Sequence, residues 1–151
     1  MIKLYIFYIV LGFYVLYYSL LGWVFPFDGA LIQTDIALIF SFVLFFIAPA
    51  ICLYKPKNAT GLGLICLAGI TPFGIHWVQY RLLNEYFIVE KPENVLMYFA
   101  IVWYLMTLIA TINTYTVRHN LQVKYYSKNL KLVLALLPLV VFGVLVVYFT
   151  A

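Results

Sequence analysis

Five long apolar stretches dominate this sequence, and they constrain its fold more than any other feature. They cover residues 4–24, 36–54, 61–83, 95–117 and 132–151. Each has close to the roughly 20 apolar residues that a helix needs to cross the hydrocarbon core of a bilayer. Within lipid the backbone must form its own hydrogen bonds, which favours helices. The pattern therefore predicts an all-α integral membrane protein, a bundle of five transmembrane helices in a single domain, 1–151.

The composition excludes a soluble globular protein. Of the 151 residues, 67% are hydrophobic and 9% are charged, whereas soluble domains carry about 25% charged residues. The net charge of +4 does not indicate nucleic-acid binding, because the cations lie in the short segments between apolar stretches. The two cysteines, Cys52 and Cys66, lack metal-ligand spacing. We expect no cofactor and no metal.

The distribution of charge predicts the orientation in the membrane. If the helices alternate, one side receives all five acids together with Arg81 and Lys91. The other side receives only cations: Lys3, Lys55, Lys57, Arg118, Lys124, Lys128 and Lys131. The positive-inside rule places this second side in the cytoplasm, with the N-terminus inside and the C-terminus outside. A bacterial inner (plasma) membrane is the simplest location for such a chain.

The third apolar stretch, 61–83, differs from the others in its small and polar residues. Gly61, Gly69 and Gly74 would let neighbouring helices approach closely, as small residues do in membrane bundles. Pro72 removes one backbone hydrogen bond and favours a kink. These residues predict a helix-packing role, with the third helix at the centre of the bundle.

Polar side chains follow Pro72 at helical spacing. His76, Gln79 and Tyr80 stand at i, i+3 and i+4 and so share one face. Polar groups within a span commonly face the protein interior or a cavity. One interpretation is an outward-facing ligand pocket, and its candidate residues are His76, Trp77, Gln79, Tyr80, Arg81, Glu85 and Trp103. The alternative is that His76 and Gln79 form hydrogen bonds that hold the helices together.

Two further segments carry regular polar patterns. Thr107, Thr111 and Thr114 stand at i, i+4 and i+7, which is typical of a helix–helix contact, with a polar pore lining as the alternative. The segment after the fourth stretch is basic. Its residues Arg118, Lys124, Lys128 and Lys131 would contact anionic lipid headgroups or a partner protein.

No motif in the sequence identifies a reaction. There is no Cys-x-x-Cys redox pair and no His-Glu-x-x-His zinc motif. This absence, with so little length outside the spans, favours a non-catalytic small subunit of a larger membrane complex. The alternatives are a small carrier or ligand-binding protein with an outward-facing pocket, and a membrane enzyme acting on lipid-like substrates. The expected partners are membrane lipids and either other membrane subunits or a second copy, but not nucleic acid.

Overall fold

A computed structural model describes residues 1–24, 31–83, 92–120 and 126–150. All regular elements in these ranges are helical. Five helices are long and apolar enough to cross a membrane, namely Ile2–Leu21, Ile32–Tyr54, Pro56–Tyr80, Val95–Thr116 and Lys128–Tyr148. The prediction of an all-α chain with five helices of spanning length is confirmed. The orientation of the chain in the membrane stays a prediction.

The helices begin before the apolar stretches that predict them. The elements are α1 (Ile2–Val24), α2 (Leu31–Phe42), the π-helical turn η1 (Val43–Ile47), α3 (Ala48–Tyr54), α4 (Pro56–Leu83), α5 (Pro92–Thr116), the 3₁₀ turn η2 (Arg118–Asn120) and α6 (Lys128–Thr150). Pro56 and Pro92 occupy first helical positions, where a missing N–H costs nothing. Ser127 precedes α6, and its hydroxyl accepts the Leu130 N–H at 3.3 Å. These start signals extend α4, α5 and α6 into their polar flanks.

The second span is continuous through α2, η1 and α3. Pro49 cannot donate a backbone hydrogen bond, and its ring would clash with the carbonyl one turn earlier. The chain widens into a π turn just before this proline, where the Ala48 N–H donates to the Val43 carbonyl. The wider turn lets the span continue past Pro49 without a break.

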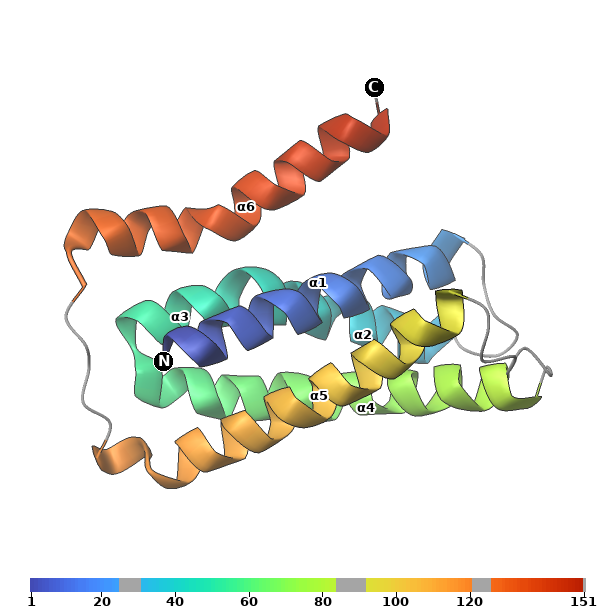
Figure 1. The fold of residues 1–151 in the computed structure, drawn as a ribbon, viewed down its shortest axis with the longest axis horizontal. Coiled ribbons are helices and arrows are strands. Elements are labelled where there is room, and N and C mark those ends of the chain that lie inside the picture. Colours follow the sequence, from blue (N-terminus) through green and yellow to red (C-terminus); the bar gives the residue numbers. More distant parts are fainter. Residues whose placement is uncertain (25–30, 84–91, 121–125, 151) are drawn as a thin grey trace.

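Four of the five spans form a bundle (Figure 1). α1 contacts the second span and α5, and α4 contacts the same two elements. In the first and second spans 44% of the apolar stretch is buried, against 33% in the third. α4 therefore occupies one corner of the bundle rather than its centre. The shared core includes Tyr8, Leu11, Leu44 and Leu67.

Three glycines mark the close helix contacts. A Cβ atom at Gly12 would lie 2.7 Å from the backbone nitrogen of Phe45 on the second span. Gly63 packs against the ring and hydroxyl of Tyr8, and Gly69 packs against the ring of Phe40. Of the predicted packing residues, Gly69 thus makes such a contact, whereas Cβ atoms at Gly61 and Gly74 would meet no described atom within 4 Å.

The last helix stands apart from the other four (Figure 1). Only 6% of the apolar stretch of α6 is buried. It touches the bundle through the rings of Phe46 and Phe142, 5.5 Å apart, and through the Tyr5 hydroxyl, which donates to the Leu134 carbonyl at 2.5 Å. Pro138 lacks the N–H that would normally bond to this carbonyl. Tyr5 therefore satisfies a backbone acceptor that Pro138 leaves free.

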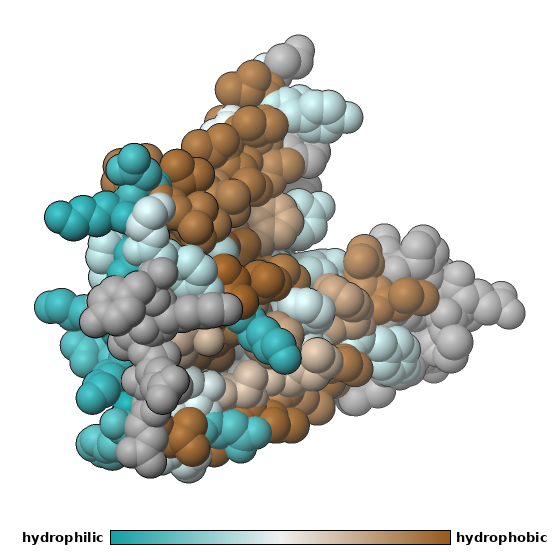
Figure 2. Space-filling model, turned by 60° about the vertical axis from the view of Figure 1, so that its left-hand side comes forward, coloured by the Kyte–Doolittle hydropathy of each residue, from teal (hydrophilic) through white to brown (hydrophobic). Residues whose placement is uncertain are grey.

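The alternating helices bring the cationic segments to one end of the molecule. Lys3 at the start of α1 and Pro56 after Lys55 line the same space as Thr114 near the end of α5. Figure 2 shows hydrophilic side chains gathered at one end of the molecule and hydrophobic side chains along the helices. Lys124 lies outside the described residues. The described cations at this end are among those that the sequence assigns to the cytoplasmic side.

Candidate functional site

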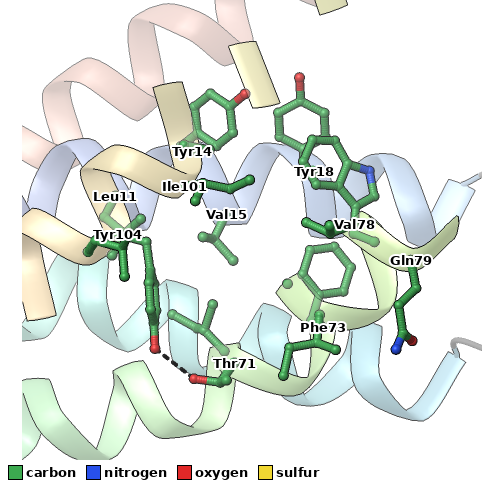
Figure 3. Close-up of a pocket in the computed structure, with 16 residues that line it drawn as sticks. Leu11, Tyr14, Val15, Tyr18, Thr71, Phe73, Val78, Gln79, Ile101 and Tyr104 are labelled. Atoms are coloured by element: carbon green, nitrogen blue, oxygen red, sulfur yellow. Dashed lines mark hydrogen bonds between the residues drawn. The ribbon is translucent and has the colours of Figure 1, made fainter. Parts of the chain in front are cut away.

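A cavity of about 380 Å³ lies between α1, α4 and α5. Figure 3 shows its labelled side chains arranged around this space. α1 contributes Leu11, Tyr14, Val15 and Tyr18, and α5 contributes Ala100, Ile101, Tyr104 and Leu105. α4 contributes Ile70, Thr71, Phe73, Gly74, Ile75, Trp77, Val78 and Gln79. The cavity is therefore built by two consecutive helices, α4 and α5, together with α1, which is distant from them in the sequence.

Small residues leave this space open. A Cβ atom at Gly74 would meet no described atom within 4 Å, and Ala100 faces the same cavity from α5. Glycine at position 74 thus makes no close helix contact. Its missing side chain instead enlarges the cavity.

Aromatic rings form one wall. The ring of Tyr18 lies between those of Tyr14 and Trp77, with centroid distances of 4.8 Å and 4.9 Å. Tyr14 is also fixed to α5, because its hydroxyl donates to the Leu96 carbonyl at 2.5 Å. Such ring contacts restrict side-chain rotation. These contacts join the three rings into one wall that presents mainly carbon atoms.

Two hydroxyl groups lie at one end of the cavity (Figure 3). Thr71 Oγ1 is 2.8 Å from the Leu67 carbonyl, to which it donates, and 2.7 Å from the Tyr104 hydroxyl. With the threonine proton used in this way, Tyr104 donates to Thr71 Oγ1. Both hydroxyl protons are then satisfied within the protein. This end can contact an apolar group without leaving a donor unpaired.

The other end carries Gln79, whose side chain is exposed. Thr71 and Gln79 are eight residues apart, which corresponds to about 12 Å along a helix axis. Between them the lining is apolar. Thr71 and Tyr104 thus lie toward one end of the cavity and Gln79 toward the other, and the surface exposed to the cavity is almost entirely apolar.

The opening lies on the flank of the bundle. Ile75 on α4 and Leu105 on α5 both line the cavity, and they are 54% and 49% exposed. In Figure 1, α5 runs obliquely to α4 and lies close to α1 at the end distant from the N-terminus. If the helices span a bilayer, this apolar mouth faces lipid rather than water.

The structure brings together some of the residues of the predicted pocket and separates others. Trp77 and Gln79 line the cavity, whereas His76, Tyr80 and Trp103 do not. Trp103 packs between Phe7 and Phe99 and donates its indole N–H to the Phe7 carbonyl at 3.3 Å.

Two candidates fall beyond what the structure describes, namely the side chain of Arg81 and the residue Glu85. The sequence-based pocket omitted Tyr14, Tyr18 and Tyr104, which form much of the lining. Tyr14 and Tyr18 belong to a first apolar stretch that is rich in tyrosine, whereas no sequence pattern points to Tyr104.

His76 lies on a different face of α4, toward α2. Phe40 of α2 packs on Gly69 of α4, and the one-residue connection at Lys55 makes these two spans antiparallel. Two helical turns further along, Gln33 and His76 therefore come to equivalent positions. The Oε1 atom of Gln33 and the Nε2 atom of His76 are both buried without a hydrogen-bond partner among the described residues. The Nε2 atom of His76 thus does not form the predicted bond between helices.

The threonine stripe of α5 is closed rather than pore-like. Thr107 and Thr111 are fully buried, and each hydroxyl donates at 2.7 Å to a carbonyl of its own helix. Thr114 does the same to Ala110. The Tyr8 hydroxyl lies 3.2 Å from Thr111 Oγ1 and blocks the space toward α4. The stripe forms a helix contact through Tyr8.

In the described ranges no group of three His, Cys, Asp or Glu side chains lies together. Cys52 and Cys66 are buried free thiols that pack in the core. Comparison of the chain with known protein families, curated proteins and solved structures gave no match. The cavity must therefore be interpreted from its own chemistry.

Proposed function

We propose that this chain is a membrane protein that binds a lipid-like ligand in the cavity between α1, α4 and α5. The observation that carries the proposal is an apolar cavity whose mouth, at Ile75 and Leu105, lies on the exposed flank of two spanning-length helices. An apolar ligand dissolved in the bilayer would enter there without crossing water. The cavity volume of about 380 Å³ is within the range of known small-molecule sites.

Selectivity in such a site must come from shape and from the ends of the cavity. Lipid tails are as apolar as the lining, so burial of methylene groups alone gives no preference for the protein over the bilayer. The wall formed by the packed rings of Tyr14, Tyr18 and Trp77 supplies shape. The paired hydroxyls of Thr71 and Tyr104 accommodate the apolar tail, because both of their protons are already bonded.

The exposed lining of the cavity is almost entirely apolar, so a charged group of the ligand would find no partner there. A polar end of the ligand would therefore remain at the mouth or outside it. We assign the ligand to lipid-like molecules whose buried part is apolar and uncharged.

Filling the cavity tests this proposal. Gly74→Leu places a side chain in open space within the cavity, and Gly61→Leu places the same side chain in open space on the same helix, away from the cavity. Native mass spectrometry of the detergent-purified chain would detect retained ligand. Wild type and Gly61→Leu should retain it, and Gly74→Leu should lose it. Equal retention by all three proteins would contradict the proposal.

A second candidate is the role of accessory subunit in a larger membrane complex. The observation that favours it is α6, which is apolar on all sides and 6% buried. The mass of the particle extracted in mild detergent decides between the two. Stoichiometric foreign subunits would support the accessory role, and a particle of this chain alone would oppose it.

The enzyme alternative gains no supporting observation. Among the described residues, the polar groups of the lining side chains are hydroxyls, one indole N–H and one amide, without an acid, a histidine or a thiol. General acid–base or nucleophilic chemistry commonly uses such titratable groups. Ligand binding without a reaction is the use that this lining fits best.

A further inference from the structure

A second cavity lies at the end of the bundle where α1 begins. Its volume is about 720 Å³, and it is enclosed by the start of α1, the end of α3, the start of α4 and the end of α5. One part of its lining is polar, with Lys3, Asn113 and Tyr126. Another part is apolar, with Leu4 and Phe7. Polar and apolar side chains therefore line the same space.

The polar part offers hydrogen-bond donors that the described part of the chain does not use. Lys3 carries three N–H donors, Asn113 two and Tyr126 one. These side chains make no hydrogen bond or ion pair with the described part of the chain. Thr114, which also lines the cavity, donates its proton to Ala110 and keeps only acceptor capacity. Three side chains from different elements thus provide donors around one space.

The charge around this cavity is positive. Lys55 precedes Pro56, which lines the cavity, and Arg118 lies two residues beyond the end of α5. Asp35, an acid in the described ranges, lies near the start of α2 at the opposite end of the bundle. With no described acid beside these cations, the cavity attracts anions.

We propose that this second cavity binds the phosphate-bearing headgroup of an anionic membrane lipid. Lys3, Asn113 and Tyr126 would bind the phosphate oxygens, since charge-assisted bonds to such oxygens are strong. The apolar side chains of Leu4 and Phe7 would contact the first part of the acyl chains. A free phosphate ion would gain nothing from this apolar wall. The site shares no lining residue with the first cavity and does not depend on the function proposed for it.

Lipid titration of the full chain in detergent tests the site, with binding followed by native mass spectrometry. The probes are phosphatidylglycerol, which is anionic, and phosphatidylcholine, which is net neutral. Lys3→Gln removes the lining cation, and Lys57→Gln removes an exposed cation at the same end that does not line the cavity. Both lysines are exposed, so neither change should impair folding.

We expect phosphatidylglycerol to bind more tightly than phosphatidylcholine to the wild type. Lys3→Gln should weaken phosphatidylglycerol binding about fivefold, which corresponds to about 1 kcal/mol per cation near an anionic lipid. Asn113→Leu should also weaken it, and Lys57→Gln should change it less than twofold. Equal binding of the two lipids, or equal effects of Lys3→Gln and Lys57→Gln, would overturn the proposal.

Inorganic phosphate separates a lipid headgroup from a free anion. Added in excess over phosphatidylglycerol, it should leave the bound lipid in place, because the acyl chains add contacts that the ion lacks. Displacement of the lipid by phosphate alone would overturn the lipid assignment in favour of a free anion. Gly74→Leu in the first cavity should not affect this titration, so the two proposals fail independently.

Discussion

Gly61 and Gly63 lie two residues apart on α4, and the structure predicts opposite effects of replacing them by alanine. A Cβ atom at Gly63 would overlap the hydroxyl and the ring of Tyr8, whereas a Cβ atom at Gly61 would meet no described atom within 4 Å. Tyr8 cannot move away easily, because it is fully buried and its hydroxyl lies 3.2 Å from Thr111 Oγ1. The two positions therefore form a matched pair on the same helix.

The magnitudes follow from two opposing terms. Glycine to alanine within a helix favours the helix by about 1 kcal/mol, and this gain applies at both positions. Overpacking a filled core costs about 1–3 kcal/mol, and this cost applies only at Gly63. Because the gain in helix stability is the same at both positions, it cancels when the stabilities of the two variants are compared. We expect Gly63→Ala to be about 1–3 kcal/mol less stable than Gly61→Ala.

Reversible unfolding in mixed detergent micelles, followed by circular dichroism, would measure this difference. Tyr8→Phe provides a second test, because it removes the atom closest to the added methyl group. Gly63→Ala should cost less in the Tyr8→Phe background than in the wild type, as expected for residues in contact. Equal stability of Gly61→Ala and Gly63→Ala, or additive effects with Tyr8→Phe, would refute the packing described here.

Two further substitutions test other contacts. Tyr5→Phe removes the hydroxyl that donates to the Leu134 carbonyl, which has no helical partner because Pro138 lacks an N–H. This change should lower the free energy of unfolding by about 0.6 kcal/mol and should widen the distribution of spin-label distances between α1 and α6. An unchanged distance distribution would count against this hydrogen bond. His76→Leu removes a ring whose Nε2 atom has no partner in the described chain; unfolding stability should be unchanged or higher, and a clear loss would show that His76 has an essential partner.

The sequence by itself determined the helices. Long apolar stretches in lipid leave the backbone no partners except its own, so five helices of spanning length follow from local composition. Their starts were less well predicted, because Pro56, Pro92 and Ser127 act as start signals outside the apolar windows. The grouping of cations followed from the alternation of the helices.

Only the tertiary structure decided which residues form a site. Helical spacing places His76, Gln79 and Tyr80 near one another on α4, but it cannot say which neighbouring helix each one meets. Packing placed His76, seven residues after Gly69, on the face of α4 that meets α2, and it placed Trp77 beside the cavity. Packing also brought the hydroxyl of Tyr104 on α5 within hydrogen-bonding distance of Thr71 on α4. A cavity is a space left between distant segments, so its lining depends on how the helices pack and not on the composition of any one of them.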